Sequence, residues 1–196
     1  FYRRLKNQED NGLQILMRYT LRLLTSQQFL RASGLICAME QIRKQNIRDL
    51  GSKEFSIAVW LGSDTTPNQR KIAAQKAKQL IEGVKGIKNP FLLLRCPWCS
   101  AQMGPIKYSR GKKPSFAPNC IGYERIANHV NFKCPDSKCE FHNEKLPIYV
   151  IDDDIYEKCP TLIIGTVDKF AQLAWEPRAK KLFGLSEEGK RINPPP

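Results

Sequence analysis

The sequence predicts an α/β fold in which part of a parallel sheet with flanking helices carries a small, inserted zinc-ribbon-like module. Stretches rich in β-branched and aromatic residues alternate with amphipathic helical stretches, which is typical of parallel sheets with right-handed crossovers. Two close cysteine pairs interrupt this alternation. We therefore expect four segments: a first part of the α/β body at 1–90, a zinc-binding insertion at 91–147, a second part of the body at 148–185, and a proline-ended linker at 186–196.

The cysteine pairs are the strongest local signal. Two residues separate Cys96 from Cys99, and four separate Cys134 from Cys139. Two thiolates at either spacing can bind one side of a tetrahedral zinc ion, and a second pair completes the site. We predict that these four cysteines hold a structural zinc ion, because four protein ligands leave no open position for catalysis.

Other assignments of the cysteines stay open at this point. Two disulfides, or unrelated buried thiols, are the alternatives, but the basic chain with its irregular cysteine pattern looks intracellular, and we expect a cytoplasmic protein. Cys120 and His142 are possible substitute ligands. Cys37 lies in an apolar helical stretch, which favours a place in the core.

The first part of the body begins with a polar, basic stretch at 1–12, which we expect to be a loop. A short strand follows at 13–19, then a turn from Thr20 to Thr25, and Ser26 is the expected N-cap of a helix that reaches about residue 48. We predict a strand at 55–60 and an amphipathic helix at 68–82. Gly51 and Gly83 are the expected helix stops.

After the insertion, strands are predicted at 146–151 and 160–165. Asp152, Asp153 and Asp154 lack the alternating spacing of an oxygen-ligand metal loop, so we expect a solvated turn there. Thr166 or Asp168 is the expected cap of a last helix, which runs through Leu173 and Trp175. Ligands of parallel sheets lie at the carboxyl ends of the strands, which are 19–25, 62–66 and 165–169 here.

Charge points to a polyanionic partner. The 196 residues carry a formal net charge of +13, and zinc bound by four thiolates would leave about +11. Nucleic acid is the first candidate partner, and a basic piece of a larger, more neutral protein is the alternative. No apolar run approaches the roughly 18 residues that would span a bilayer, so no membrane partner is expected. The abrupt start and the proline-rich end suggest a fragment of a longer protein.

The three strand ends carry a family resemblance. The run YTLRLLTSQQF (19–29) resembles motif Ia, Gly62 falls in a glycine-containing loop, and PTLIIGTVDKF (160–170) resembles motif Ib of the first RecA-like domain of superfamily 2 helicases. With LRCPWC (94–99) and CEFHNEKLPIYVIDDDIY (139–156), the chain is most similar to the helicase subunit of the DISARM phage-defence system and its relatives. The resemblance implies an ATP-dependent helicase or translocase that binds DNA, with a possible partner subunit in a defence complex.

The resemblance also implies what this chain would contribute to such an enzyme. The family's P-loop and DEAH-like motif, which hold ATP and magnesium, do not occur in these 196 residues. We therefore expect no ATP hydrolysis by this segment alone and assign it no catalytic residue. The alternative function is a stand-alone zinc-ribbon module that binds nucleic acid or protein. The expected phosphate contacts are Thr20, Arg22, Thr25, Gln27, Gly62, Thr166 and Lys169 at the strand ends, and Lys107, Arg110, Lys112 and Lys113 in the insertion.

Overall fold

The computed structural model describes residues 1–10, 12–20, 22–108, 117–172, 175–186 and 188–196, with backbone alone at 22–25. Two compact units share these residues. The sheet unit comprises Phe1–Thr66 and Pro147–Pro196, and the cysteine unit comprises Pro67–Leu146. The described part of the chain has no helix with both the length and the apolarity to span a membrane.

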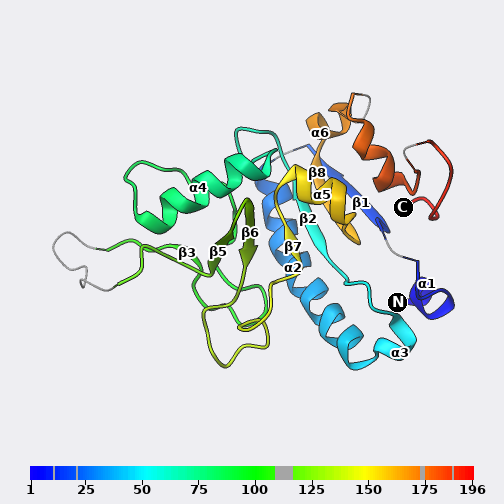
Figure 1. Cartoon of the computed structure of the whole chain (residues 1–196), viewed down its shortest axis with the longest axis horizontal. Helices are drawn as coiled ribbons and strands as arrows, with labels where there is room; N and C mark the ends of the chain where they lie inside the picture. The colour runs from blue at the N-terminus through cyan, green and yellow to red at the C-terminus, as the bar shows by residue number, and fades with distance from the viewer. Residues whose placement is uncertain (11, 21, 109–116, 173–174, 187) are drawn as a thin grey trace. The chain divides into compact units, whose positions relative to one another are not determined.

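A four-stranded parallel sheet forms the centre of the sheet unit and confirms the predicted α/β class (Figure 1). Its spatial order is β1 (Ile15–Tyr19), β8 (Leu162–Thr166), β2 (Ile57–Trp60) and β7 (Ile148–Tyr149). All of its neighbouring pairs are parallel. Every residue of β2 and β8 is buried, as expected for central strands covered on both faces.

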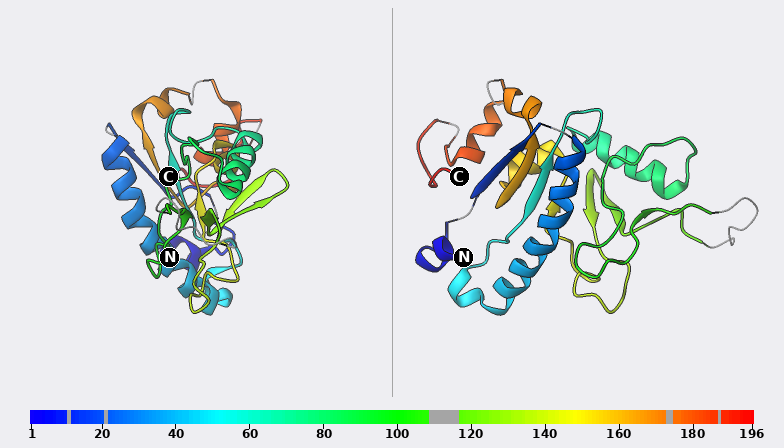
Figure 2. Two further views of the ribbon diagram at one scale, coloured as in Figure 1. Left: turned by 90° about the vertical axis from the view of Figure 1, so that its left-hand side faces the viewer. Right: turned by 180° about the vertical axis from the view of Figure 1, so that it is seen from behind.

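Helices cover both faces of this sheet (Figure 2). The long helix α2 packs on β2 and β8 from one side. From the other side, Ile155 and Leu182 join a core cluster with Trp60 and Ile163. The helices of this unit are α1 (Tyr2–Lys6), α2 (Arg22–Gln45), α3 (Ile47–Leu50), α5 (Asp152–Lys158), α6 (Val167–Ala171) and the 3-10 helix η2 (Pro177–Phe183).

Several predicted helix boundaries were wrong. Residues 1–12 include the short helix α1, and α2 begins at Arg22, so the expected turn from Thr20 to Thr25 and the Ser26 cap do not exist. Leu, Arg and Gln between residues 22 and 28 are good helix formers, and they outweigh the two hydroxyl side chains that suggested a start at Ser26. Gly51 ends α3, with φ at 76°, as predicted for a helix stop. The last helix, α6, ends at Ala171; Leu173 lies outside the described residues, and Trp175 is 87% exposed.

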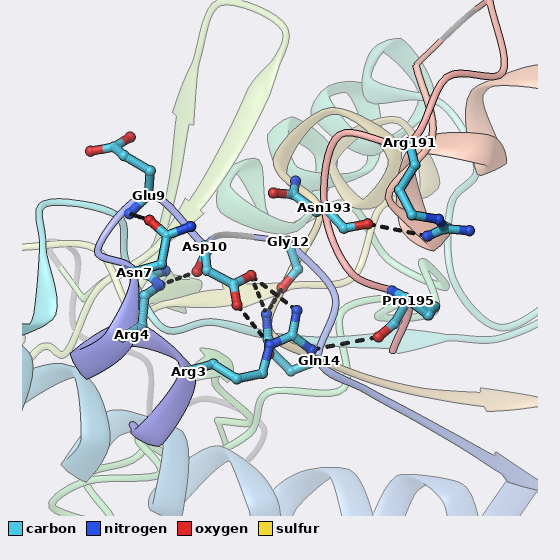
Figure 3. Close-up of polar contacts among 10 residues, drawn as sticks. All are labelled: Arg3, Arg4, Asn7, Glu9, Asp10, Gly12, Gln14, Arg191, Asn193 and Pro195. Carbon is cyan, nitrogen blue, oxygen red and sulfur yellow. Dashed lines mark hydrogen bonds and ion pairs between the residues drawn. The ribbon is translucent and has the colours of Figure 1, made fainter.

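An arginine-rich cluster ties the start of the sheet unit to its other segments (Figure 3). The Arg3 guanidinium donates to both carboxylate oxygens of Asp10, at 2.7 and 3.0 Å. Arg4 donates to the Asp10 carbonyl and to the carbonyls of Leu50 and Lys53. The Arg4 contacts fix α1 against the end of α3, because a buried guanidinium must have its N–H groups paired.

The cysteine unit is smaller and has short strands. The amphipathic helix α4 packs on the hairpin of β5 and β6 and on β4. Phe91, Tyr123 and Phe132 form an edge-to-face aromatic cluster with centroid distances of 5.2–5.6 Å. Gly83 ends α4 in the left-handed conformation, as predicted. The elements are α4 (Arg70–Glu82), β3 (Gly104–Pro105), β4 (Cys120–Ile121), β5 (Tyr123–Ile126) and β6 (His129–Phe132).

The division into units places α4 differently from the sequence expectation. We expected it in the α/β body and the insertion to start at residue 91. In the structure the compact cysteine unit starts at Pro67 and therefore includes α4. The apolar face of α4, with Ala73, Ala77 and Leu80 buried, covers the β5–β6 hairpin.

Candidate metal centre

Four cysteines converge in the cysteine unit. The Sγ atoms of Cys96, Cys99, Cys134 and Cys139 all lie within 4.8 Å of one another. Three of the side chains are buried and Cys99 is exposed. Cys99 Sγ lies 3.3 Å from Cys134 Sγ, which is far longer than a disulfide bond. All four thiols are free.

The donor set fits a tetrahedral metal ion. Four sulfur atoms about 2.3 Å from one zinc ion lie about 3.8 Å from each other, within the spread of distances found here. Thiolates favour soft or borderline ions such as zinc. The chemistry and spacing of these four atoms therefore suit a structural metal ion.

The first cysteine pair lies in a tight turn. The Ser100 N–H donates to the Cys96 carbonyl at 2.9 Å, and the Cys96 N–H donates to the Ala101 carbonyl at 2.8 Å. Ser100 takes a left-handed φ of 65°, which reverses the chain directly after Cys99. Arg95 and Gln102 then pair as an antiparallel bridge on either side of the turn. The backbone thus aims both thiols at the same point.

The second pair lies in a similar turn. The Cys139 N–H donates to the Asp136 carbonyl at 3.0 Å, and the Cys134 N–H donates to the Phe141 carbonyl at 2.9 Å. His142 is engaged elsewhere, since its Nδ1 lies 3.0 Å from the Cys134 carbonyl oxygen. Cys120 is buried in β4 and does not belong to the cluster. The two substitute ligands left open by the sequence are therefore not in the thiol group that the structure brings together.

Protonation of the thiols follows from their surroundings. Burial raises the pKa of Cys139 to about 11 and also raises the pKa of Cys134. Burial acts in the same direction on Cys99, but hydrogen bonds from the Ala101 N–H and the neighbouring thiols outweigh it and lower the Cys99 pKa. A metal ion must displace the protons that Cys134 and Cys139 retain, so its binding would weaken in acid.

The predicted strand-end residues meet at one edge of the sheet. Tyr19 pairs in register with Thr166, and Trp60 pairs with Gly165. Thr20 directly follows Tyr19, and Gly62 comes shortly after Trp60. Both residues are therefore brought to the same edge of the sheet as Thr166. Thr20 and Gln27 are exposed, Gly62 is half-buried and Thr166 is buried. Arg22 and Thr25 lie in the first turn of α2, where the structure describes the backbone alone.

Lys169 does not fit its expected role as a phosphate ligand. Its side chain is fully buried in the first turn of α6, and its Nζ lies 2.5 Å from Asp152 Oδ2. An external phosphate does not reach this ammonium group, which is already neutralised within the protein. Sequence reasoning missed this pair because 17 residues separate its members, a spacing without a local signature.

The acidic run at 152–154 was also misjudged as a solvated turn. Asp152 and Asp154 are buried, and all three aspartates occupy the first turn of α5, where the helix dipole favours negative charge. Burial raises the pKa of Asp152, and Lys169 opposes that rise. Among the described residues, Asp152 Oδ1 and Trp60 Nε1 are buried without a hydrogen bond of ordinary geometry, although Trp60 lies close enough to lower the Asp152 pKa, and Lys169 lies 2.5 Å from the other carboxylate oxygen.

The basic residues expected in the insertion are only partly described. Lys107 is exposed. Arg110, Lys112 and Lys113 lie outside the residues that the structure describes. By sequence, the cysteine unit has fifteen Lys and Arg residues against five Asp and Glu residues, while the sheet unit has seventeen against fourteen. The formal net charges are therefore +10 and +3, and most of the positive charge belongs to the smaller unit.

Comparisons with known proteins give one informative relationship. No known family model matches the chain. Over 183 residues it is 34% identical to DISARM protein DrmA of Bacillus paralicheniformis. The alignment covers 90% of this chain but 15% of that protein's length. The chain is therefore related to one part of a much longer DISARM protein.

Proposed function

We propose that this chain is a nucleic-acid-contacting part of a larger, DISARM-related antiphage defence protein, and that it contributes a segment of a RecA-like helicase or translocase body. The convergence of three strand ends at one edge of a parallel sheet carries the proposal. The relationship to DISARM protein DrmA supports it, because the sequence motifs resemble a protein of the same defence system. The net charge of +13 favours a polyanionic partner.

The strand-end edge would contact the phosphodiester backbone of one strand. Backbone N–H groups near Gly62, the Thr20 hydroxyl and the Gln27 amide are groups that bind phosphate oxygens without reading sequence. Thr20 and Gln27 are exposed and available for such contacts. The buried Thr166 and Lys169 would hold the β8–α6 turn in place from inside the protein and would not bind the phosphate themselves.

The metal centre would be structural. Four cysteine ligands fill a tetrahedral shell and leave no position for a substrate or an activated water. When bound, zinc would link two turns that are 38 residues apart in the sequence between Cys96 and Cys134. The ion would thereby stabilise a small unit whose core otherwise consists of the buried face of α4 and an aromatic cluster with its apolar neighbours.

Binding of nucleic acid is tested by fluorescence anisotropy of labelled DNA at low and high salt. We expect binding that weakens steeply with salt, since released counterions drive phosphate contacts. Gln27→Glu should weaken it by up to roughly tenfold, because it places a negative charge at the proposed backbone track. Gln45→Glu, at the exposed far end of the same helix α2, is the matched control and should change affinity little. No binding even at low salt would contradict the proposal.

ATP hydrolysis is expected to require more than this chain. Neither a Gly-x-x-x-x-Gly-Lys-Ser/Thr loop nor an Asp-Glu-x-His run occurs in the 196 residues. Without these groups, the β- and γ-phosphates and the magnesium ion lack their usual ligands. We expect no DNA-stimulated phosphate release from the isolated chain in a malachite-green assay. Measurable release that scales with protein concentration and survives repurification would overturn this expectation.

A further inference from the structure

The uneven charge of the two units raises the question of where a polyanion first binds. The cysteine unit has a formal net charge of +10 on far fewer residues than the sheet unit, which has +3. Four metal-bound thiolates and one divalent ion would reduce the former to about +8. The electrostatic attraction of a phosphate backbone is therefore centred on the cysteine unit.

A groove of about 420 Å³ lies beside the first cysteine turn of this unit. We call it the knuckle groove, and its lining residues are Leu94, Arg95, Gln102, Met103, Pro105 and Lys107. Arg95 and Lys107 are exposed, and Leu94 is 57% exposed although it is apolar. One Arg95 donor reaches the Ser100 carbonyl at 3.2 Å, which orients the guanidinium and leaves its other N–H groups for a ligand.

We propose that the knuckle groove binds the phosphodiester backbone of one nucleic-acid strand, with Arg95 and Lys107 on phosphate oxygens and Leu94 against a sugar or base. This inference rests on the proposed function and assigns its main electrostatic contact to the cysteine unit. The volume is that of a small-ligand pocket, which suits a single strand. Two cations beside an exposed apolar side chain match a nucleotide, which presents an anionic phosphate and an apolar sugar and base face.

A metal ion bound by the four cysteines would hold the turn that joins both walls of this groove. Arg95 directly precedes the ligand Cys96, and it pairs with Gln102 across the turn that the metal would close. The Met103 N–H donates to the Leu94 carbonyl at 2.9 Å. This hydrogen bond joins the same two walls one residue further from the cysteine turn. Loss of the metal would free the turn and separate Arg95 from Lys107. Binding to the groove should therefore depend on metal occupancy.

The test compares two double variants of the metal-loaded chain by anisotropy with a fluorescein-labelled oligothymidine. R95Q/K107Q should raise the Kd roughly tenfold and lower the slope of log K against log salt by about 1 to 1.5, since each lost phosphate contact on a single strand accounts for about 0.7. R48Q/K53Q removes one Arg and one Lys from exposed positions of the sheet unit and should shift the Kd less than twofold. Circular dichroism and bound metal should be unchanged in both variants, because all four side chains are exposed and the backbone hydrogen bonds of the cysteine turn remain when the Arg95 bond to Ser100 is lost.

Each outcome distinguishes the groove from the function on which it rests. If the wild type binds and R95Q/K107Q binds equally well, the groove assignment is overturned while the proposed function stands. If the wild type does not bind at low salt, the proposed function fails. Removing the metal with a chelator should weaken binding as much as R95Q/K107Q does, with metal content measured in parallel. Tight binding by the metal-free protein would overturn the dependence on the metal centre.

Discussion

The two units of this chain are stabilised by different means. In the sheet unit, β2 and β8 are buried along their whole length, and helices supply apolar side chains to both faces. In the cysteine unit, the named strands have two to four residues, and four thiols lie at one point. Burial of apolar area can stabilise the first unit by itself, whereas the second resembles small domains that need a metal.

The difference also concerns charge. The cysteine unit has most of the net positive charge, which repels itself and opposes a compact fold, and its strands are short. A metal ion that links the two cysteine turns would stabilise the unit against this repulsion. Strong positive charge and four converging thiols therefore occur together in this unit, whereas a small net charge and a large apolar core occur together in the other.

Loss of the metal should separate the two units most clearly. Cys96→Ser removes one ligand, and structural zinc contributes about 10–16 kcal/mol in small peptides. We expect residues 67–146 to lose their amide protection while β1 and β8 retain theirs, measured by hydrogen exchange with mass spectrometry. Cys120→Ala is the matched control, because Cys120 is buried in the same unit outside the thiol cluster. Exchange that rose evenly through both units would refute the division.

In the sheet unit, the buried ion pair of Lys169 and Asp152 is a site where a single substitution should be strongly destabilising. Lys169→Met leaves the Asp152 carboxylate without its cation in a buried site, and breaking such a pair costs about 3–5 kcal/mol. Denaturant unfolding should show that loss. Replacing both residues with apolar ones, as in D152L/K169M, should recover much of it.

The control for this experiment is the exposed pair of Lys158 and Glu157 in α5. Lys158→Met should cost less than about 1 kcal/mol, as solvent screens the pair. A Lys169→Met protein as stable as the wild type would mean that the ion pair does not hold the β8–α6 turn. Metal binding by the cysteine unit should be the same in all of these variants, since the pair lies wholly within the sheet unit.

Local patterns were sufficient to predict the features that depend on neighbouring residues. The β-branched runs predicted β2 and β8, the apolar period predicted α4, and the cysteine spacing predicted the four thiols that meet. Each of these signals lies within a few residues. The start of α2 was missed because hydroxyl residues at 20–26 imitate a helix cap, and the good helix formers among them decide the outcome.

Features that depend on tertiary structure could not be predicted in this way. The apolar face of α4 fits a sheet or a hairpin equally well, so the sequence did not show that it covers β5 and β6. A lysine after a strand has the same pattern whether it binds a phosphate or a buried aspartate. The role of Lys169 therefore became visible only when Asp152 was found at 2.5 Å.

Acid should affect the two units in separate steps. In the cysteine unit, protonation of thiolates would release the metal. In the sheet unit, the Arg3 guanidinium holds the pKa of Asp10 below its ordinary value of 3.8. The unfolded chain therefore binds a proton at Asp10 at higher pH than the folded chain does, so this contribution is present above pH 3.8 and disappears as pH falls through the folded pKa.

The smallest predicted effect follows from the difference between the pKa of Asp10 in the folded chain and its pKa in the unfolded chain. Asp10→Asn should cost the sheet unit about 1–2 kcal/mol near pH 6, where the carboxylate accepts two charge-assisted bonds from Arg3. The stability gap between wild type and variant should close below pH 3.8, measured as exchange of β1 amides so that metal release does not obscure it. Glu9→Gln, at the exposed neighbouring position, is the control and should give a much smaller gap. A gap that stayed constant down to pH 2 would show that Asp10 stabilises the unit without its charge, and the contrast between an ionic link here and a metal link in the cysteine unit would be lost.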